Sequence, residues 1–260
     1  MAKKKRKEEY TYLRPALMII AILVAAVVLI ERIKESRKKF IHYEEFGIEI
    51  PPYYEIHGID VSRYQQRINW EMVAAMKVKN IRMGFAFIKA TEGIKNVDPQ
   101  FKRNWREAAR AGIPRGAYHF FITSKSGREQ AENFIRTVDL KPGDLPPVLD
   151  VEVSYGVNAE TIRKRCKEWL DMVEEHYGVK PIIYTNVDFY TRILKDDFDE
   201  YPLWIAHYLE KHRPRIYRDW SFWQHSETGK VNGIKGNVDF NVFNGDSADF
   251  RKLLVPSFPR

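Results

Sequence analysis

The sequence predicts an α/β protein, specifically a modified TIM-like barrel with eight strands. Three observations carry this prediction. Short apolar runs alternate with longer segments of helical periodicity from residue 55 to about residue 200, which is typical of parallel strands joined by crossover helices. Three further strand-like runs then follow without convincing helices, and no glycine-rich phosphate loop follows the first strand. Five β/α units and three strands largely lacking helices make eight strands, which suits one closed barrel.

The five expected β/α units consist of apolar runs of strand length, each followed by a segment of helical periodicity. The strands are expected at 55–62, 81–90, 114–121, 146–153 and 180–186. The helices are expected at 69–79, 98–111, 126–138, 159–177 and 187–195. Cys166, the one cysteine, lies on the apolar face of the fourth helix, so an internal disulfide is excluded and a packing role is indicated.

The last three strands are expected at 202–208, 220–226 and 237–243, and a helix at 246–254 follows them. In a closed barrel the eighth strand lies beside the first. The alternative architecture is an open doubly wound sheet, which the missing phosphate loop disfavours.

Positive charge is concentrated in the first 40 residues. They hold 11 Lys and Arg against 4 Asp and Glu, whereas the rest of the chain holds 32 against 31. A nucleic-acid-binding protein needs basic residues across its folded surface, so this nearly neutral body argues against a nucleic-acid partner.

An uncharged stretch, "PALMIIAILVAAVVLI" at 15–30, follows the basic run "KKKRK" at 3–7. We expect residues 1–40 to form a cytoplasmic basic tail and a signal-anchor transmembrane helix at about 13–31. A cleaved signal peptide and a buried soluble helix are the alternatives. No small-residue cleavage site stands in the "ERIKESRKKF" that comes next, and nothing nearby would cover a buried helix.

The rest of the chain is expected to hold a linker at 41–54 and a catalytic barrel at 55–255. The chain would then be a single-pass membrane protein, with its catalytic domain outside the cytoplasm on the periplasmic or cell-surface side.

Two carboxylates interrupt the apolar run "LPPVLDVEVS" at 145–154. Asp150 and Glu152 share one parity of a strand, so both point to the same face. Strand ends meet at the mouth of a barrel, and Asp60 and Asp239 lie in the first and eighth strands, so four acids are expected to converge there. An edge strand with one solvated face and a site for a hard cation are the alternative explanations.

Aromatic and polar side chains share this expected mouth and are candidate substrate contacts. They are Tyr118, Phe120, Tyr184, Trp204, Trp223 and Gln224. Sugar rings pack on aromatic faces and hydrogen-bond through their hydroxyls, and two acids beside a glycosidic bond can catalyse its hydrolysis. Crowding Asp150 beside Glu152 would raise one of their pKa values, which suits a general acid.

Several motifs resemble those of the glycoside hydrolase family 25 lysozymes, in the order expected of that family. They are "GIDVSRYQ", "AFIKATEG", "PPVLDVE", "PIIYTN", "PLWIAHY", "WSFWQHS" and "GIKGNVDFNVFNG". The resemblance covers residues 55–245. "WQHS" departs from the pattern, because His225 stands where family members often carry an aromatic residue.

The resemblance implies an N-acetylmuramidase that cleaves the β-1,4 bond between N-acetylmuramic acid and N-acetylglucosamine in the glycan strands of peptidoglycan. It places the catalytic acids at Asp60, Asp150, Glu152 and Asp239, with Glu152 as the general acid. Because N-acetylated substrates offer their own amide oxygen as a nucleophile, we also expect net retention through a substrate-assisted route. It implies no cofactor and no metal. The alternative function is a catalytically silent glycan-binding barrel anchored at the membrane.

Overall fold

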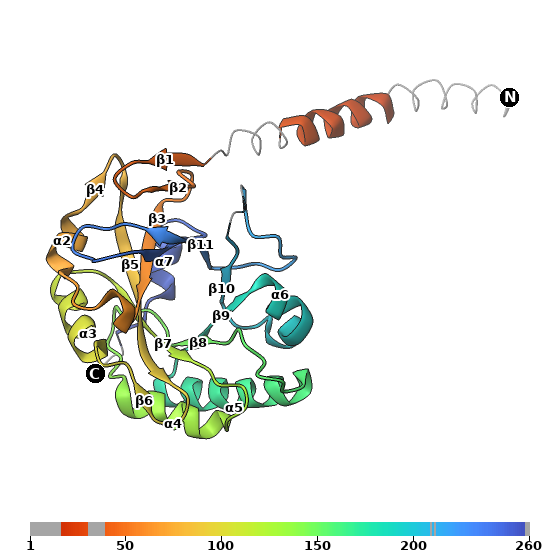
Figure 1. The fold of residues 1–260 in the computed structure, drawn as a ribbon. Helices are drawn as coiled ribbons and strands as arrows, with labels where there is room; N and C mark the ends of the chain where they lie inside the picture. Colours follow the sequence, from red (N-terminus) through yellow and green to blue (C-terminus); the bar gives the residue numbers. More distant parts are fainter. Residues whose placement is uncertain (1–16, 31–39, 209, 211, 258–260) are drawn as a thin grey trace, which may run out of the picture.

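The computed structural model describes residues 17–30, 40–208, 210 and 212–257. Eight strands form a closed barrel with helices around part of its outer wall (Figure 1). The barrel strands are β3 (Ile56–Val61), β5 (Ile81–Glu92), β7 (Arg115–Phe120), β8 (Val148–Asp150), β9 (Ile182–Asn186), β10 (Leu203–Ala206), β11 (Phe222–Gly229) and β12 (Val238–Phe243). The predicted fold class is confirmed, and all eight expected strands are present.

The first and last strands close the barrel, as the sequence predicts. Seven neighbouring strands run parallel, but β12 is antiparallel to both β11 and β3. This reversal brings the start of β12 to the end of the barrel where β3 finishes. Asp239 therefore pairs in register with Asp60, at the mouth of the barrel.

Helices connect the first five strands and cover that part of the wall. They are α2 (Trp70–Ala75), α3 (Phe101–Arg110), α4 (Gly127–Thr137), α5 (Ala159–Tyr177) and α6 (Val187–Phe189), which continues as a π-helix at Tyr190–Leu194. Side chains of Asn69, Ser126 and Asn158 cap helix N-termini by accepting backbone N–H bonds. The last helix, α7 (Ser247–Leu253), follows β12 and begins at the cap Asp246. Short elements complete the fold: β4 (Lys77–Val78), β6 (Asn96–Val97) and a 3-10 turn at Arg63–Gln65.

Aromatic rings fill the barrel interior below the mouth. The Phe87 ring stacks on Trp204 with centroids 4.3 Å apart, and Phe85 packs edge-on against Phe87. Gly58 makes room for this packing, because a Cβ there would lie 2.6 Å from the Phe85 ring. The interior is thus a packed core rather than a channel, and it forms a rigid floor for the site above.

A hairpin that the sequence did not predict covers strands that lack helices. Strands β1 (Ile41–Tyr43) and β2 (Ile48–Ile50) lie within 41–54, the segment expected to be a linker. Phe46 is fully buried against Phe240 of β12, with ring centroids 5.3 Å apart. The hairpin therefore belongs to the hydrophobic core of the barrel wall.

The expected membrane anchor falls partly outside the described residues. Residues 17–30 are helical and exposed, whereas residues 1–16 and 31–39 are not described. Among the described segments, none of the helices combines the length and the apolar character needed to cross a bilayer.

Candidate active site

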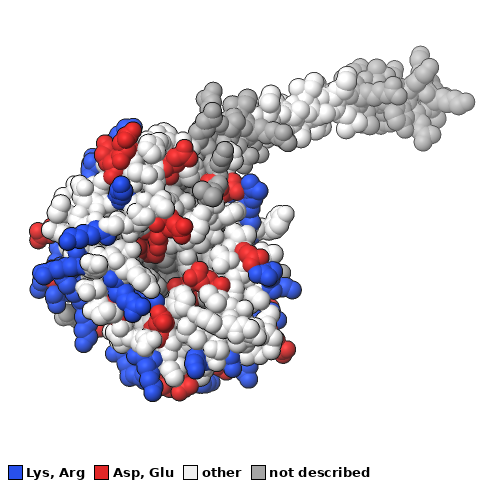
Figure 2. Space-filling view, viewed as in Figure 1, with Lys and Arg blue, Asp and Glu red and all other residues white. Residues whose placement is uncertain are grey.

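A pocket of about 410 Å³ opens at the mouth of the barrel. Figure 2 shows this hollow near the centre of the visible face, with Asp and Glu side chains around it. The residues that line it come from all eight barrel strands and from the loops that follow some of them. They are Asp60, Val61, Ser62, Tyr64, Gln65, Lys89, Tyr118, Phe120, Asp150, Glu152, Tyr184, Trp204, Tyr208, Gln224, Glu227 and Asp239.

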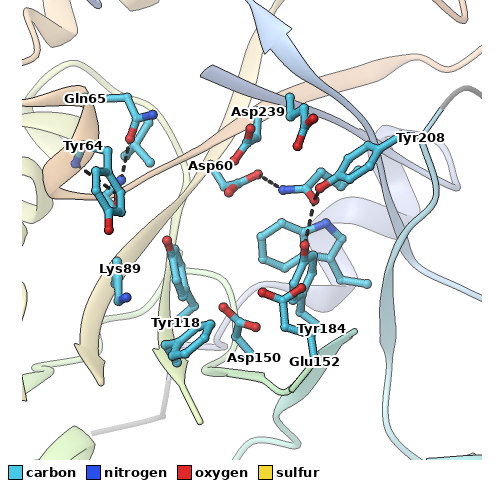
Figure 3. A pocket seen from close by; sticks show the side chains of 16 residues that line it. Asp60, Tyr64, Gln65, Lys89, Tyr118, Asp150, Glu152, Tyr184, Tyr208 and Asp239 are labelled. Carbon is cyan, nitrogen blue, oxygen red and sulfur yellow. Dashed lines mark hydrogen bonds between the residues drawn. The ribbon is translucent and has the colours of Figure 1, made fainter. Parts of the chain in front are cut away.

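The four predicted acids form two pairs that face each other across the pocket. Figure 3 shows Asp60 and Asp239 on one side and Asp150 and Glu152 on the other. The first pair comes from the register of β3 with β12. In the second pair, Asp150 ends β8 and Glu152 lies just beyond it in the loop, two residues along an extended chain.

Asp60 is fixed as a hydrogen-bond acceptor in the first pair. Its Oδ2 accepts bonds from Nε2 of Gln224 at 2.7 Å and from Nδ2 of Asn241 at 2.8 Å. Burial raises the pKa of Asp60, and these two amide donors oppose that rise. Burial, followed by the charge of Asp60, raises the pKa of Asp239 to about 9. Within the pair, the amide donors favour the negative charge on Asp60, and the raised pKa of Asp239 favours the proton there.

Both members of the second pair favour the protonated form. Burial and the charge of Glu152 raise the pKa of Asp150 well above its ordinary value, and Oδ1 of Asp150 has no hydrogen-bond partner. Burial and the charge of Asp60 raise the pKa of Glu152, while the charge of Lys89 opposes both shifts. Glu152 is the less enclosed of the two, since Asp150 is only 7% exposed. A carboxyl group that keeps its proton near neutral pH and faces open solvent can act as a general acid.

A network of hydroxyl and amide groups holds the pocket wall. Oε1 of Gln224 accepts bonds from the hydroxyls of Tyr184 at 2.7 Å and Tyr208 at 2.5 Å. The indole of Trp204 donates to Oδ1 of Asn241 at 2.8 Å, so both amides that bind Asp60 are themselves oriented. Such fixed dipoles favour one charge state without rearrangement during a reaction.

The structure separates the predicted substrate contacts into two groups. Tyr118, Phe120, Tyr184, Trp204 and Gln224 line the pocket. Trp223 does not, because neighbouring positions on a strand face opposite sides and Gln224 points inward. The Trp223 ring is instead fully buried on the outer wall, where it packs against Phe40 and Trp220.

Several lining residues were not among the predicted site residues: Tyr64, Gln65, Lys89, Tyr208 and Glu227 are examples. Tyr64 is 73% exposed, on a turn where Ser62 and Gln65 form a reciprocal cap. The amide of Gln65 also donates to the backbone carbonyl of Asn237, which ties this turn to the loop that precedes Asp239. The "SRYQ" motif beside Asp60 was a usable signal for Tyr64, whereas nothing local marked Tyr208.

A site for a hard cation is the alternative explanation for four acids at one mouth. In the part of the chain that the structure describes, no three His, Cys, Asp or Glu side chains are arranged to hold a metal ion. The four acids instead form two pairs. Hydrogen bonds to Asp60 hold the first pair, and in the second pair Asp150 and Glu152 lie close together.

Comparison with known proteins identifies the fold and its site. The sequence profile of glycosyl hydrolases family 25 matches residues 59–234, a stretch that contains Asp60, Asp150 and Glu152. The chain belongs to glycosyl hydrolase family 25. It is therefore a glycoside hydrolase by family, and the two facing acid pairs lie where its barrel opens.

Relatives in this family include proteins of bacteria. The uncharacterised protein YegX of Escherichia coli is 51% identical over 211 residues, which cover 81% of this chain and 78% of that protein. Lysozyme M1 of Streptomyces globisporus is 36% identical over 212 residues, which cover 74% of this chain and 69% of that protein.

Solved structures of family 25 proteins share the barrel. A family 25 glycosyl hydrolase from Bacillus anthracis superimposes with a TM-score of 0.71 at 36% identity, over 83% of this chain and 97% of that one. The bacterial lysozyme from Streptomyces coelicolor gives a TM-score of 0.68 at 34% identity, over 77% of this chain and 97% of that one.

Proposed function

We propose that this chain is a peptidoglycan hydrolase that cleaves the β-1,4 bond between N-acetylmuramic acid and N-acetylglucosamine, with Glu152 as the general acid. The observation that carries the proposal is the pair Asp150 and Glu152 in an open pocket of a family 25 barrel. Relatives named as lysozymes support the choice of substrate. The exposed ring of Tyr64 and the half-buried ring of Tyr208 offer sugar-packing surfaces on opposite sides of the pocket (Figure 3).

In this mechanism Glu152 gives its proton to the oxygen of the leaving sugar. Burial, followed by the charge of Asp60 across the pocket, raises the pKa of Glu152, which keeps a proton available. The ionised Asp60 and the protonated Asp239 face Glu152 across the pocket and suit a second role. We assign them to orient and polarise the acetamido group of the substrate, whose oxygen then attacks the anomeric carbon with net retention.

Replacement of the general acid gives the direct test. We expect Glu152→Gln to lower wall lysis by at least about 10²–10⁴-fold while the domain stays folded, because the amide keeps the shape and cannot give a proton. Turbidity of purified cell walls measures lysis, and thermal unfolding checks the fold. Near-normal lysis by the variant would refute the assignment. A wild-type domain that binds walls without clearing them would instead support the silent glycan-binding alternative.

Proton NMR of the first sugar released tests the stereochemistry. Retention gives the β-anomer first, and mutarotation then forms the α-anomer. An initial α-anomer would mean inversion and would remove the substrate-assisted route.

We also propose that the N-terminal segment anchors the domain in a membrane, with the barrel outside the cytoplasm. Support comes from the uncharged run at 15–30, the basic residues before it, and the exposed helix at 17–30. Full-length protein is expected to stay with membranes through a high-salt wash, because burial of an apolar helix does not depend on ionic strength. Release by salt would contradict an anchor and indicate electrostatic attachment. Protease added to spheroplasts is expected to digest the barrel, and a protected barrel would contradict the orientation.

A further inference from the structure

One ammonium group lies among the carboxyl groups of the active site. Lys89 is the single Lys or Arg among the described residues that line the pocket, which also contains Asp60, Asp150, Glu152, Glu227 and Asp239. Its side chain is 15% exposed, with Nζ 2.6 Å from Oε2 of Glu92. The same nitrogen lies 4.7 Å from the centroid of the Phe120 ring. Figure 3 shows Lys89 on the side of the pocket that carries Tyr118.

An irregularity in β5 makes the contact between Lys89 and Glu92 possible. In a regular strand, residues three apart point to opposite faces. The pairing of β5 with β7 shifts between Lys89 and Thr91, so Lys89 lies opposite Tyr118 and Glu92 lies opposite Phe120. Such a bulge redirects side chains at barrel rims. It turns both charged groups toward the mouth, with β7 lying between them and β8, the strand that ends in Asp150.

We propose that Lys89 is a positioning residue whose charge, divided between Glu92 and the catalytic acids, sets how many protons Asp150 and Glu152 hold at a given pH. The proposal rests on the hydrolytic function proposed above. Glu92 opposes this effect, because its negative charge partly neutralises Lys89 and so weakens the action of Lys89 on Asp150 and Glu152. Without Lys89 the pocket would hold five carboxyl groups and no cation of its own among the described residues.

The electrostatics of the neighbouring groups agree with this geometry. The charge of Lys89 lowers the pKa values of both Asp150 and Glu152, whereas Glu92 raises that of Asp150. The other titratable groups that face this region come from several elements around it. They are Asp60 from β3, Arg63 from the turn after it, Tyr118 and His119 from β7, Tyr155 from the loop after β8, Tyr184 from β9 and Asp239 from β12. Among these groups on the described strands, Lys89 supplies the one positive charge near the acids, since burial lowers the pKa of His119 to about 3.

The test is the pH profile of kcat/KM on soluble peptidoglycan fragments. Lys89→Met removes a positive charge, so we expect both limbs of the profile to move to higher pH by about half to one unit. Glu92→Gln frees the lysine charge to act on the acids, so we expect both limbs to move to lower pH by a similar amount. If the ion pair only stabilised the local structure, the two variants would not move the limbs of the pH profile in opposite directions.

The double variant Lys89→Met with Glu92→Gln separates charge from structure. We expect its profile to return close to that of the wild type, and Lys89→Arg to keep the wild-type limbs. Lys95, an exposed lysine in the turn between β5 and β6, provides the matched control, and Lys95→Met should leave the profile unchanged. Thermal unfolding reports whether each variant folds.

Two results would overturn the proposal. One is a loss of rate in both single variants without movement of either limb. The other is movement of both limbs in the same direction, with no recovery in the double variant. Failure of the hydrolytic function itself would be recognised separately, because Glu152→Gln would then match the wild type.

Discussion

The pair Asp60 and Asp239 shows how single residues set a charge state. Two amide groups donate hydrogen bonds to Asp60. The negative charge is therefore favoured on Asp60 and the proton on Asp239. Asn241 is as important to this outcome as either acid, although it does not line the pocket. Its loss would leave a buried carboxylate with one donor fewer, which costs more than an ordinary hydrogen bond.

The raised pKa of Asp239 predicts how stability depends on pH. The unfolded carboxyl has a pKa near 3.8, and the folded one about 9, so the folded state binds an extra proton between these values. The contribution is therefore fully present below about pH 4 and is lost as pH rises toward 9, with a slope of at most about 1.4 kcal/mol per pH unit. Asp239→Asn should remove this slope in urea unfolding measured from pH 5 to pH 9.

Asp219→Asn is the matched control for that experiment, because Asp219 is exposed and lies outside the active-site pocket. It should keep the wild-type slope. An unchanged slope in Asp239→Asn would show that Asp239 is ionised in the folded protein.

Side chains near the site differ in how well the sequence predicts them. Asp150, Glu152, Tyr118 and Phe120 were predictable, because each lies on the inward parity of a strand or of the extended chain that continues it. Trp223 was predicted to face the pocket but lies on the outer wall, because it is the strand neighbour of the inward-pointing Gln224. Side chains that act through distant contacts gave no local signal: Asn241 bonds to Asp60 across 181 positions of sequence, and Tyr208 lies in a loop.

Among the elements, the hairpin β1–β2 covers a part of the barrel wall that has no helix. Crossover helices shield the outer wall between β5 and β9, but β11 and β12 have none in the described chain. The hairpin shields these strands with Tyr43, Phe46, Ile48 and Ile50, all buried. The eight barrel strands were predictable from apolar runs, whereas these three-residue strands lie in a charged segment and are stabilised by residues almost 200 positions away.

Phe46→Ala tests the contribution of the hairpin. The ring is fully buried, so we expect the free energy of unfolding to fall by about 3–5 kcal/mol. Glu45→Ala, at an exposed neighbouring position, should change it by less than about 0.5 kcal/mol. Urea unfolding of both variants provides the measurement, and equal stability of the two would mean that the hairpin is dispensable.

At the level of the whole molecule, the same packing determines where the chain can be shortened. Removal of residues 1–39 keeps Phe40 and the hairpin, so we expect a soluble, folded and active domain. Removal of residues 1–54 would expose the buried rings of Trp223 and Phe240, and we expect aggregation or a strongly lowered Tm. Expression, thermal unfolding and wall lysis compare the two truncations. Equal behaviour would contradict a structural role for residues 40–54.

The closure of the barrel by β12 also determines when the active site comes into existence. Asp60 belongs to the first barrel strand, but Gln224, Asp239 and Asn241 arrive with the last two, 164 to 181 positions later for the two amide donors. Such distant pairings form late in folding, because the chain must lose the entropy of closing a long loop before these contacts can stabilise it. During synthesis, a partly emerged chain can fold its early β/α units but holds only one side of the first acid pair. Lytic competence is thus acquired in a single late step, when the C-terminal strand docks.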